Sequence, residues 1–372
     1  MPNDLFKVNE VEQTAMKFTS RHIEPLVEDI DHGAPQFQSE IFSRGIEAGF
    51  DRFALPEDVG GIGFQMADLC MLIKTIAKTC AGNAMIFGVH AAVLTSICEA
   101  GGDKAKSLVD KITSSKKSVA ATIPEPLSFN DFDSALTVDN EDQNSVWLSG
   151  NAGLLFNVAP GGLFVVFAKT RTGSPLAILL ESGEETFKLG SLELALGLRA
   201  MPMAELTLIA HEVPRSHVIT TGDQTVVFYR ALLRNLCLVI SAAAGGLMAT
   251  AHKKALAYAA ERYQGGKMII DHSHLRNILG AMSSNVSASI GAAFHAAAQP
   301  KDDLAVIGIK VSVTECAAKT CIDAVQILGG YGYMRDYGLE KSMRDAAMLS
   351  LLPISNVSAE LLLAAIEKEK IV

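Results

Sequence analysis

The chain has 372 residues, which exceeds the usual length of a single domain and predicts two or three units that share a core. Hydrophobic residues make up 49% of the chain and charged residues 20%, so it can bury a large core. The formal net charge is -9 and no long basic run is present. This balance argues against nucleic acid and anionic membrane surfaces as partners.

The first part of the chain, residues 1–118, predicts an N-terminal helical domain. Apolar residues recur at three- and four-residue spacing over 11–30 and 39–49, which is typical of helices. Pro56 and three glycines interrupt this pattern in PEDVGGIGF, and helical spacing resumes over 66–100. The N-terminus has no apolar signal core.

Residues 119–221 have a different texture and predict a middle antiparallel β domain. The segments SALTV, SVWLSG, GLFVVFAKT, PLAILLES, ETFKLG and AELTLIA are short, rich in β-branched and apolar residues, and separated by turn residues. No helix pattern stands between them, which argues against a parallel doubly wound sheet.

Residues 222–372 predict a C-terminal helical domain that resembles a four-helix bundle. Long alanine-rich helical patterns cover 231–264, 273–298 and 302–328, and a last helix covers 358–370. The most apolar run, 236–251, has charged neighbours too close on both sides to span a bilayer, so we expect a buried helix and no membrane span. The fold class predicted is therefore α+β and multidomain, in the order helices, sheet, helices.

Neither the cysteines nor the histidines form a pattern typical of a metal site. None of the six cysteines stands in a CxxC pair, and most lie in apolar helical surroundings. Reduced, structural thiols in a cytoplasmic protein fit this usage. His272 and His274 would point to different sides of a helix and have no cysteine or carboxylate cluster beside them.

The most informative motif is Q326-ILGGYGYMRDYGLEKSMRDA. A helix precedes its glycines where a dinucleotide fold needs a strand, so it is not a Rossmann turn. It resembles the C-terminal signature of the acyl-CoA dehydrogenase family, Q-x-x-GG-x-GY followed by RDA. Four more stretches resemble motifs of that family in the same order: ALPEDVGGIG, IPEPLSFND, GLRAMPMAEL with EVPRSHVI, and AYAAERYQGGKMI. The resemblance covers nearly the whole chain.

The resemblance implies FAD as the cofactor, bound between the β domain and the C-terminal helices, and an oligomer, usually a tetramer. It implies that Gln326, Gly329 and Gly330 of one subunit meet the FAD of its neighbour, and that Arg262 meets the FAD phosphates. Glycine permits close backbone approach and a guanidinium suits phosphate. The other positions that match cofactor contacts of the family are Leu127, Asn130, Leu155, Phe156, Ser273 and Ser355.

The family removes the acyl α-proton with a glutamate, and here that position reads Pro353. Proline has no ionisable group, so we assign no catalytic residue. The alternative position of the base in some relatives reads Leu236-Cys237. Glu360 lies seven residues beyond Pro353, about 10 Å along a helix axis, which is too far without remodelling.

Other positions depart from the pattern of the family in the same direction, because hydroxyl, amide or aromatic groups beside the flavin are replaced. They are Pro124, Asn130, Leu154, Phe156, Met201, Gly265 and Ser273. Together these changes indicate a relaxed demand on both FAD affinity and dehydrogenation.

Three hypotheses follow. The first is a non-catalytic subunit that completes the FAD site of a competent paralogue. The second is a flavoenzyme of this fold that acts on an acyl-CoA thioester without this base. The third is an acyl-CoA dehydrogenase of fatty acid metabolism whose base is Glu360 or Cys237. A binding or scaffold protein without flavin is the remaining alternative. An acyl-CoA thioester, a paralogous subunit in a dimer or tetramer, and an electron-accepting flavoprotein are the predicted partners.

Overall fold

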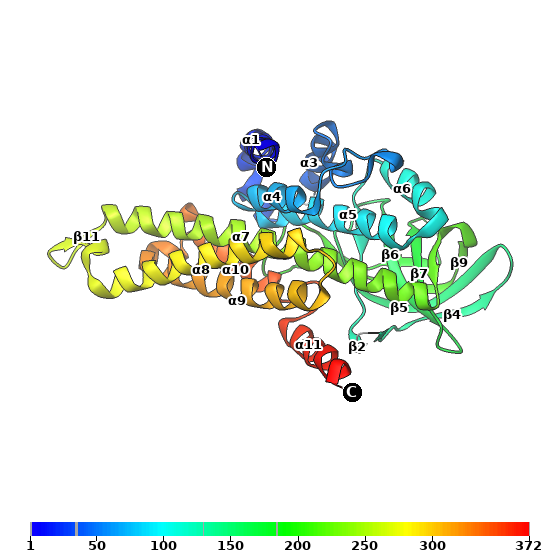
Figure 1. Cartoon of the computed structure of the whole chain (residues 1–372). Coiled ribbons are helices and arrows are strands. Elements are labelled where there is room, and N and C mark those ends of the chain that lie inside the picture. Colours follow the sequence, from blue (N-terminus) through cyan, green and yellow to red (C-terminus); the bar gives the residue numbers. More distant parts are fainter. Residues whose placement is uncertain (1, 34–35, 129, 184, 372) are drawn as a thin grey trace.

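The structure is a computed structural model that describes residues 2–33, 36–128, 130–183 and 185–371. Helices, a sheet and helices again follow one another along the chain (Figure 1). This order confirms the fold class predicted from the sequence. The boundaries given above for the three domains stay predictions.

The first part of the chain is helical, as its apolar spacing predicts. Its helices are α1 (Pro2–His22), α2 (Val27–Asp31), α3 (Gln36–Glu47), α4 (Met66–Ala77), α5 (Ala81–Ala100) and α6 (Ala105–Ser114). The pattern over 11–30 reads as one helix, but a 3-10 turn at Glu24–Leu26 divides it. Pro25 causes the division, because proline lacks the N–H that a continuing helix needs.

The middle of the chain forms an eight-stranded sheet with the strand order β10-β7-β6-β1-β5-β9-β8, in which β4 pairs with β5 and β6. The pairing is mostly antiparallel, but β1 and β4 each lie parallel to β6. The strands of this sheet are β1 (Val119–Ala121), β4 (Leu136–Glu141), β5 (Ser145–Phe156), β6 (Leu163–Thr170), β7 (Pro175–Glu181), β8 (Phe187–Leu189), β9 (Met203–Pro214) and β10 (Val218–Thr221). A short separate ribbon joins β2 (Pro126–Ser128) to β3 (Asp131–Phe132).

The two faces of the sheet belong to two different hydrophobic cores. On β6, Phe164 and Val166 point into a core that lies within the sheet domain, whereas Val165 and Phe167 point into the core shared with the helices. This split follows from the period of two along a strand. The sheet is therefore anchored to the helices by every second residue of its central strands.

The last part of the chain is a bundle built around α7 (Asp223–Glu261). Its other helices are α8 (Ser273–Ala298), α9 (Asp303–Leu328), α10 (Leu339–Leu349) and α11 (Asn356–Ile371). A hairpin of β11 (Tyr263–Gln264) and β12 (Lys267–Met268) joins α7 to α8 at the end of the bundle that lies away from the sheet (Figure 1). By length and composition α5 and α7 could cross a membrane, but their apolar windows are 89% and 100% buried in the protein. Both are core helices of the protein.

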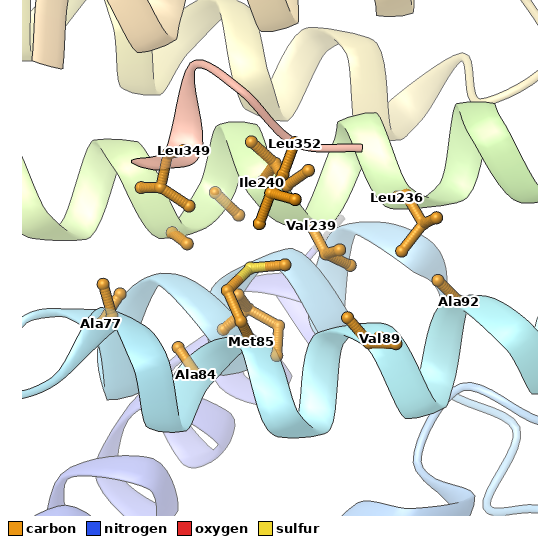
Figure 2. Close-up of a cluster of buried hydrophobic side chains, with 14 of the residues drawn as sticks. Ala77, Ala84, Met85, Val89, Ala92, Leu236, Val239, Ile240, Leu349 and Leu352 are labelled. Carbon is orange, nitrogen blue, oxygen red and sulfur yellow. The ribbon is translucent and has the colours of Figure 1, made fainter. Parts of the chain in front are cut away.

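Close contact between α5 and α7 fills the centre of the molecule. Figure 2 shows Met85 and Val89 of α5 packed toward Val239 and Ile240 of α7, with Leu352 entering from the segment after α10. A Cβ added at Gly88 would lie 3.2 Å from the Cβ of Val239, so glycine lets the two helices approach closely. The segment after α10 is thereby tied to the main core.

A buried charge network joins all three parts of the chain. The Asp345 carboxylate on α10 is fully buried and accepts hydrogen bonds from the Leu198 backbone N–H (2.7 Å) and from Lys341 (2.5 Å). Arg344 pairs with Asp31 of α2 at 2.6 Å. Burial raises the pKa of Asp31, but the Arg344 hydrogen bond and nearby cations outweigh it, and the net pKa is below the usual value. The stretches GLR and RDA therefore contact each other directly.

Candidate functional site

A cavity of about 330 Å³ lies where the sheet meets the segment after α10, and we call it the Pro353 cavity. Its size is in the range of small-molecule sites. Its wall consists of Thr122, Ile123, Pro124, Glu125, Asp133, Ser134, Ala135, Asn151, Ala152, Gly153, Leu154, Phe156, Phe167, Leu351, Leu352 and Pro353. The segment 351–353 thus meets residues 122–125, 133–135, 151–154, Phe156 and Phe167 of the middle part of the chain.

Strand β5 supplies one wall, and the alternation of its side chains decides which of them face the cavity. Leu154 and Phe156 line it. Leu155, which stands between them, is fully buried in the core inside the sheet domain, so its side chain points away. Of the two predicted cofactor contacts on this strand, the structure places the side chain of Phe156 in the wall and that of Leu155 behind it.

Position 353 offers little chemistry. Proline supplies neither a carboxylate nor a backbone N–H, so this residue can neither accept a proton nor donate to a carbonyl oxygen. Leu351 and Leu352 beside it are apolar. The Pro353 side of the cavity is therefore a hydrophobic wall.

The two alternative bases named from the sequence are not part of this wall. Cys237 is fully buried in α7, and burial raises the pKa of its thiol to about 12. A thiol with that pKa is protonated at neutral pH. Glu360 is exposed on α11 and is absent from the lining of the cavity.

Two carboxylates that sequence reasoning missed do line the Pro353 cavity. They belong to Glu125 and Asp133, and the backbone N–H of Asp133 donates to the Glu125 carbonyl at 2.8 Å. Next to them, the Tyr229 hydroxyl donates to the Pro124 carbonyl at 3.0 Å, and burial raises the pKa of that hydroxyl. The acidic residue inside the PEP stretch was the available signal for Glu125. No motif pointed to Asp133.

A second cavity, of about 530 Å³, lies at the end of α7 and α9, and we call it the Arg262 cavity. It brings Arg262 together with Gly329 and Gly330, which are more than sixty positions away in the sequence. The rest of its lining is Tyr258, Gln264, Ile269, Ile327, Leu328, Tyr331 and Met334. Three of the predicted cofactor contacts therefore share one cavity.

The glycines of this cavity present bare backbone. A Cβ added at Gly329 or Gly330 would meet no atom within 4 Å, and Gly329 has φ +58° with ψ −131°. That conformation strains any residue with a side chain, so the turn requires glycine. A guanidinium opposite exposed backbone suits an anionic group such as a phosphate.

Three tyrosines stand beside the Arg262 cavity and were not predicted. The rings of Tyr258, Tyr331 and Tyr337 form a cluster with centroids 5.8 to 6.2 Å apart. Tyr258 and Tyr331 line the cavity itself. The aromatic residue within GGYG was a usable signal, whereas Tyr258 reaches the site only through the packing of α7 against the end of α9.

The remaining predicted cofactor contacts lie outside both cavities. Gln326 is exposed on α9, Ser273 is exposed at the start of α8, and Leu127 and Asn130 are exposed around the β2–β3 ribbon. Ser355 stands just before α11, where its hydroxyl accepts a hydrogen bond from the Ser358 N–H at 3.0 Å. In a single chain these residues do not gather around one pocket. Among the described residues there is also no group of three or more metal-ligating side chains.

The two cavities are far apart. Tyr229, which bonds Pro124 in the wall of the Pro353 cavity, and Tyr258, which lines the Arg262 cavity, are 29 positions apart on α7. At the rise of an α-helix this separation is about 43 Å. In Figure 1 the β11 hairpin beside Arg262 and the sheet lie at opposite ends of α7.

Comparison with known proteins gives this arrangement a family. Residues 7–113 match the model for the acyl-CoA dehydrogenase N-terminal domain, and residues 229–352 match that for the acyl-CoA dehydrogenase C-terminal domain. The chain is 26% identical to an acyl-CoA dehydrogenase of Bacillus subtilis (strain 168) over 363 residues, which are 93% of this chain and 94% of that protein.

Two solved structures share the fold. Butyryl-CoA dehydrogenase from Megasphaera elsdenii superposes with a TM-score of 0.86 at 22% identity, over 97% of both chains. A chain in a structure of the electron transferring flavoprotein of Acidaminococcus fermentans has a TM-score of 0.87 at 23% identity, over 96% of this chain and 97% of that chain.

The α–β–α fold and the two matched regions define a protein of the flavoprotein oxidoreductase class. The chain belongs to the acyl-CoA dehydrogenase family. This confirms the resemblance drawn from the five sequence motifs. The members of the family are FAD-dependent flavoproteins, and acyl-CoA substrates and oligomers are typical of them.

Proposed function

We propose that this chain is an acyl-CoA dehydrogenase-like subunit with a degenerate active site. It does not abstract the acyl α-proton by the usual glutamate route. It completes the FAD site of a neighbouring subunit, and the neighbour is a paralogue that retains the glutamate.

The observation that carries this proposal is the place of Pro353. The family position of the base is in the wall of a cavity of suitable size, but it holds a residue with no proton acceptor and no N–H. In the same cavity, the side chains of Leu154 and Phe156 are both hydrocarbon. They offer no hydrogen bond to the polar edge of a flavin ring, so this cavity fits that ring poorly.

The Arg262 cavity fits the phosphate part of FAD better. Arg262 would hold the phosphates, the bare backbone of Gly329 and Gly330 would allow close approach, and Tyr258 and Tyr331 offer aromatic faces for a base. FAD supplies hydride acceptance when it is bound, and the role of these residues is to bind and orient it. The family features that remain are thus those that serve a cofactor.

The distance between the two cavities supports a site shared between subunits. About 43 Å of helix is longer than one extended FAD molecule, so one FAD cannot contact both cavities of the same chain. The surface around each of the two cavities also exposes apolar side chains, which are typical of interfaces. Near the Arg262 cavity these are Tyr331, Tyr333 and Met334, and around the Pro353 cavity and α11 they are Leu127, Leu351, Val357 and Leu361.

The proposal is tested by measuring how much flavin each chain binds. The chain is purified gently by itself, its visible spectrum is recorded, and released flavin is measured per chain before and after FAD is added. We expect well below one flavin per chain, and a normal content once a family member with the glutamate is co-purified. About one flavin per chain in the isolated protein would overturn the proposal.

A second candidate function rests on Glu125 and Asp133. If the chain binds its own FAD, these carboxylates line the same cavity as Pro353 and are candidates for a replacement base acting on an acyl-CoA thioester. Turnover of an acyl-CoA with an artificial electron acceptor, lost in Glu125→Gln or Asp133→Asn, would favour this candidate over the first.

The remaining partners follow from the family. We propose an acyl-CoA thioester as the ligand, a dimer or tetramer as the assembly and an electron-accepting flavoprotein as the acceptor for the competent subunit. A role in fatty acid metabolism in the cytoplasm is part of the same proposal.

A further inference from the structure

A buried lysine lies behind the wall that carries Pro353. Lys310 is on α9, and no part of its side chain is exposed to solvent. Its Nζ donates to the backbone carbonyls of Ser350 (3.2 Å) and Ile354 (2.9 Å), and to the Asn356 side-chain oxygen (2.8 Å). All three donors of the ammonium group are therefore used, and all three acceptors belong to the segment 350–356.

The environment of Lys310 is unusual for a charged group. Its three hydrogen-bond acceptors are all neutral oxygens, and burial lowers the pKa of its amino group to about 8. Burying a cation against neutral acceptors alone is costly, so the hydrogen bonds that offset this cost are strong constraints on the groups that accept them.

The segment 350–356 is also held by hydrophobic packing. Leu352 and Ile354 are almost fully buried, at 6% and 3% exposure. The segment is closed on itself by the Asn356 N–H, which donates to the Ser350 carbonyl at 3.0 Å, and Asn356 also donates to Thr314 at 3.1 Å. Pro353 stands at the centre of this closed segment and faces the cavity.

We infer that Lys310 is a positioning residue for the Pro353 wall. Its ammonium group fixes the segment 350–356, and it thereby sets where the side chain at position 353 lies relative to the cavity. This inference goes beyond the proposed function, because it concerns how the wall is held and applies whether the chain is catalytic or not.

The test is amide hydrogen exchange in the full-length protein, which needs neither flavin nor substrate. Its outcome is therefore independent of that of the flavin count. In Lys310→Met we expect exchange in the peptide covering 350–359 to accelerate by about tenfold or more, the effect of one lost hydrogen bond to a charged group. The matched control is Val313→Ala, a buried change on the same helix that leaves these hydrogen bonds intact.

The result that overturns the inference is acceleration no greater in Lys310→Met than in Val313→Ala. Lys310→Arg keeps a cationic donor, and we expect it to restore slow exchange; exchange as fast as in the Met variant would exclude a role for the charge. If Lys310→Met does not fold, Asn356→Ala removes one acceptor from the other side. It should accelerate exchange in the same peptide, and unchanged exchange would contradict the inference.

Discussion

The Pro353 cavity and the Arg262 cavity lie at the two ends of α7, and they differ in what they offer a flavin. The Arg262 cavity has a guanidinium, bare glycine backbone and aromatic rings. The Pro353 cavity has hydrocarbon at position 353 and on β5, and carboxylates at Glu125 and Asp133. Under the proposed function, the Arg262 cavity binds the cofactor and the Pro353 cavity lacks the usual base. In an oligomer such ends would face different partners.

The largest effect is expected from introducing a carboxylate at position 353 of the Pro353 cavity. In the flavin-containing oligomer that this chain forms with a family member whose own glutamate is replaced by glutamine, Pro353→Glu should oxidise an acyl-CoA about 10²-fold faster than Pro353→Gln, because a positioned base contributes at least that factor. The matched glutamine has the same shape without the proton acceptor. The rate is followed with an artificial electron acceptor. Equal rates in the flavin-loaded Glu and Gln variants would show that the side chain at position 353 does not reach the acyl α-proton.

The second largest effect is expected at the Arg262 cavity. Arg262→Leu should weaken flavin retention by the purified oligomer by about 10- to 100-fold, because it removes charge-assisted hydrogen bonds. Equilibrium titration with FAD measures the change. Arg171→Leu is the control, because Arg171 is an exposed arginine on the sheet domain. If both variants retain flavin equally well, the Arg262 cavity does not hold the phosphates and the contrast between the two ends disappears.

The smallest effect concerns Lys310, which we expect to make the free energy of unfolding depend on pH. Its pKa in the folded protein, about 8, lies below the value of 10.5 for a free lysine. Between these values the unfolded chain holds the proton and the folded protein does not, so stability rises with pH in that window. We expect the free energy of unfolding to rise by about 2 kcal/mol more in the wild type than in Lys310→Met from pH 8 to 10. Parallel curves from denaturant titrations would contradict a depressed pKa.

The order of helices, sheet and helices follows from local patterns that the sequence displays. Short segments rich in β-branched and apolar residues and separated by turn residues distinguish the strands from the helices, and the apolar spacing over 231–264 indicates α7. Mistakes at this level had local causes, such as the break at Pro25 within one continuous apolar pattern. The alternation of side chains along β5 also predicts that Leu155 and its neighbours Leu154 and Phe156 point to opposite faces of the sheet. Leu155 therefore cannot line the same cavity as those two residues.

The candidate site depended on the sequence for its identity and on the tertiary structure for its geometry. The resemblance to the family named Arg262, Gly329, Gly330 and Pro353 as residues of interest, the last because it stands where the family has its glutamate. The sequence alone does not place Glu125 and Asp133 in the same wall as Pro353. That meeting requires the sheet and the end of α10 to pack together.

Lys310 illustrates the difference between what the sequence determines and what the tertiary structure determines. Lys310 lies on the buried side of α9, one turn from Ile307 and Thr314, and the sequence analysis did not single it out. Its role was not predictable from the sequence, because its three acceptors lie 40 to 46 positions further on. The sequence by itself determined the elements, the family motifs and the absence of a base at position 353. Only the tertiary structure decided which side chains meet, because cavities and buried hydrogen bonds arise from contacts between segments that are distant along the chain.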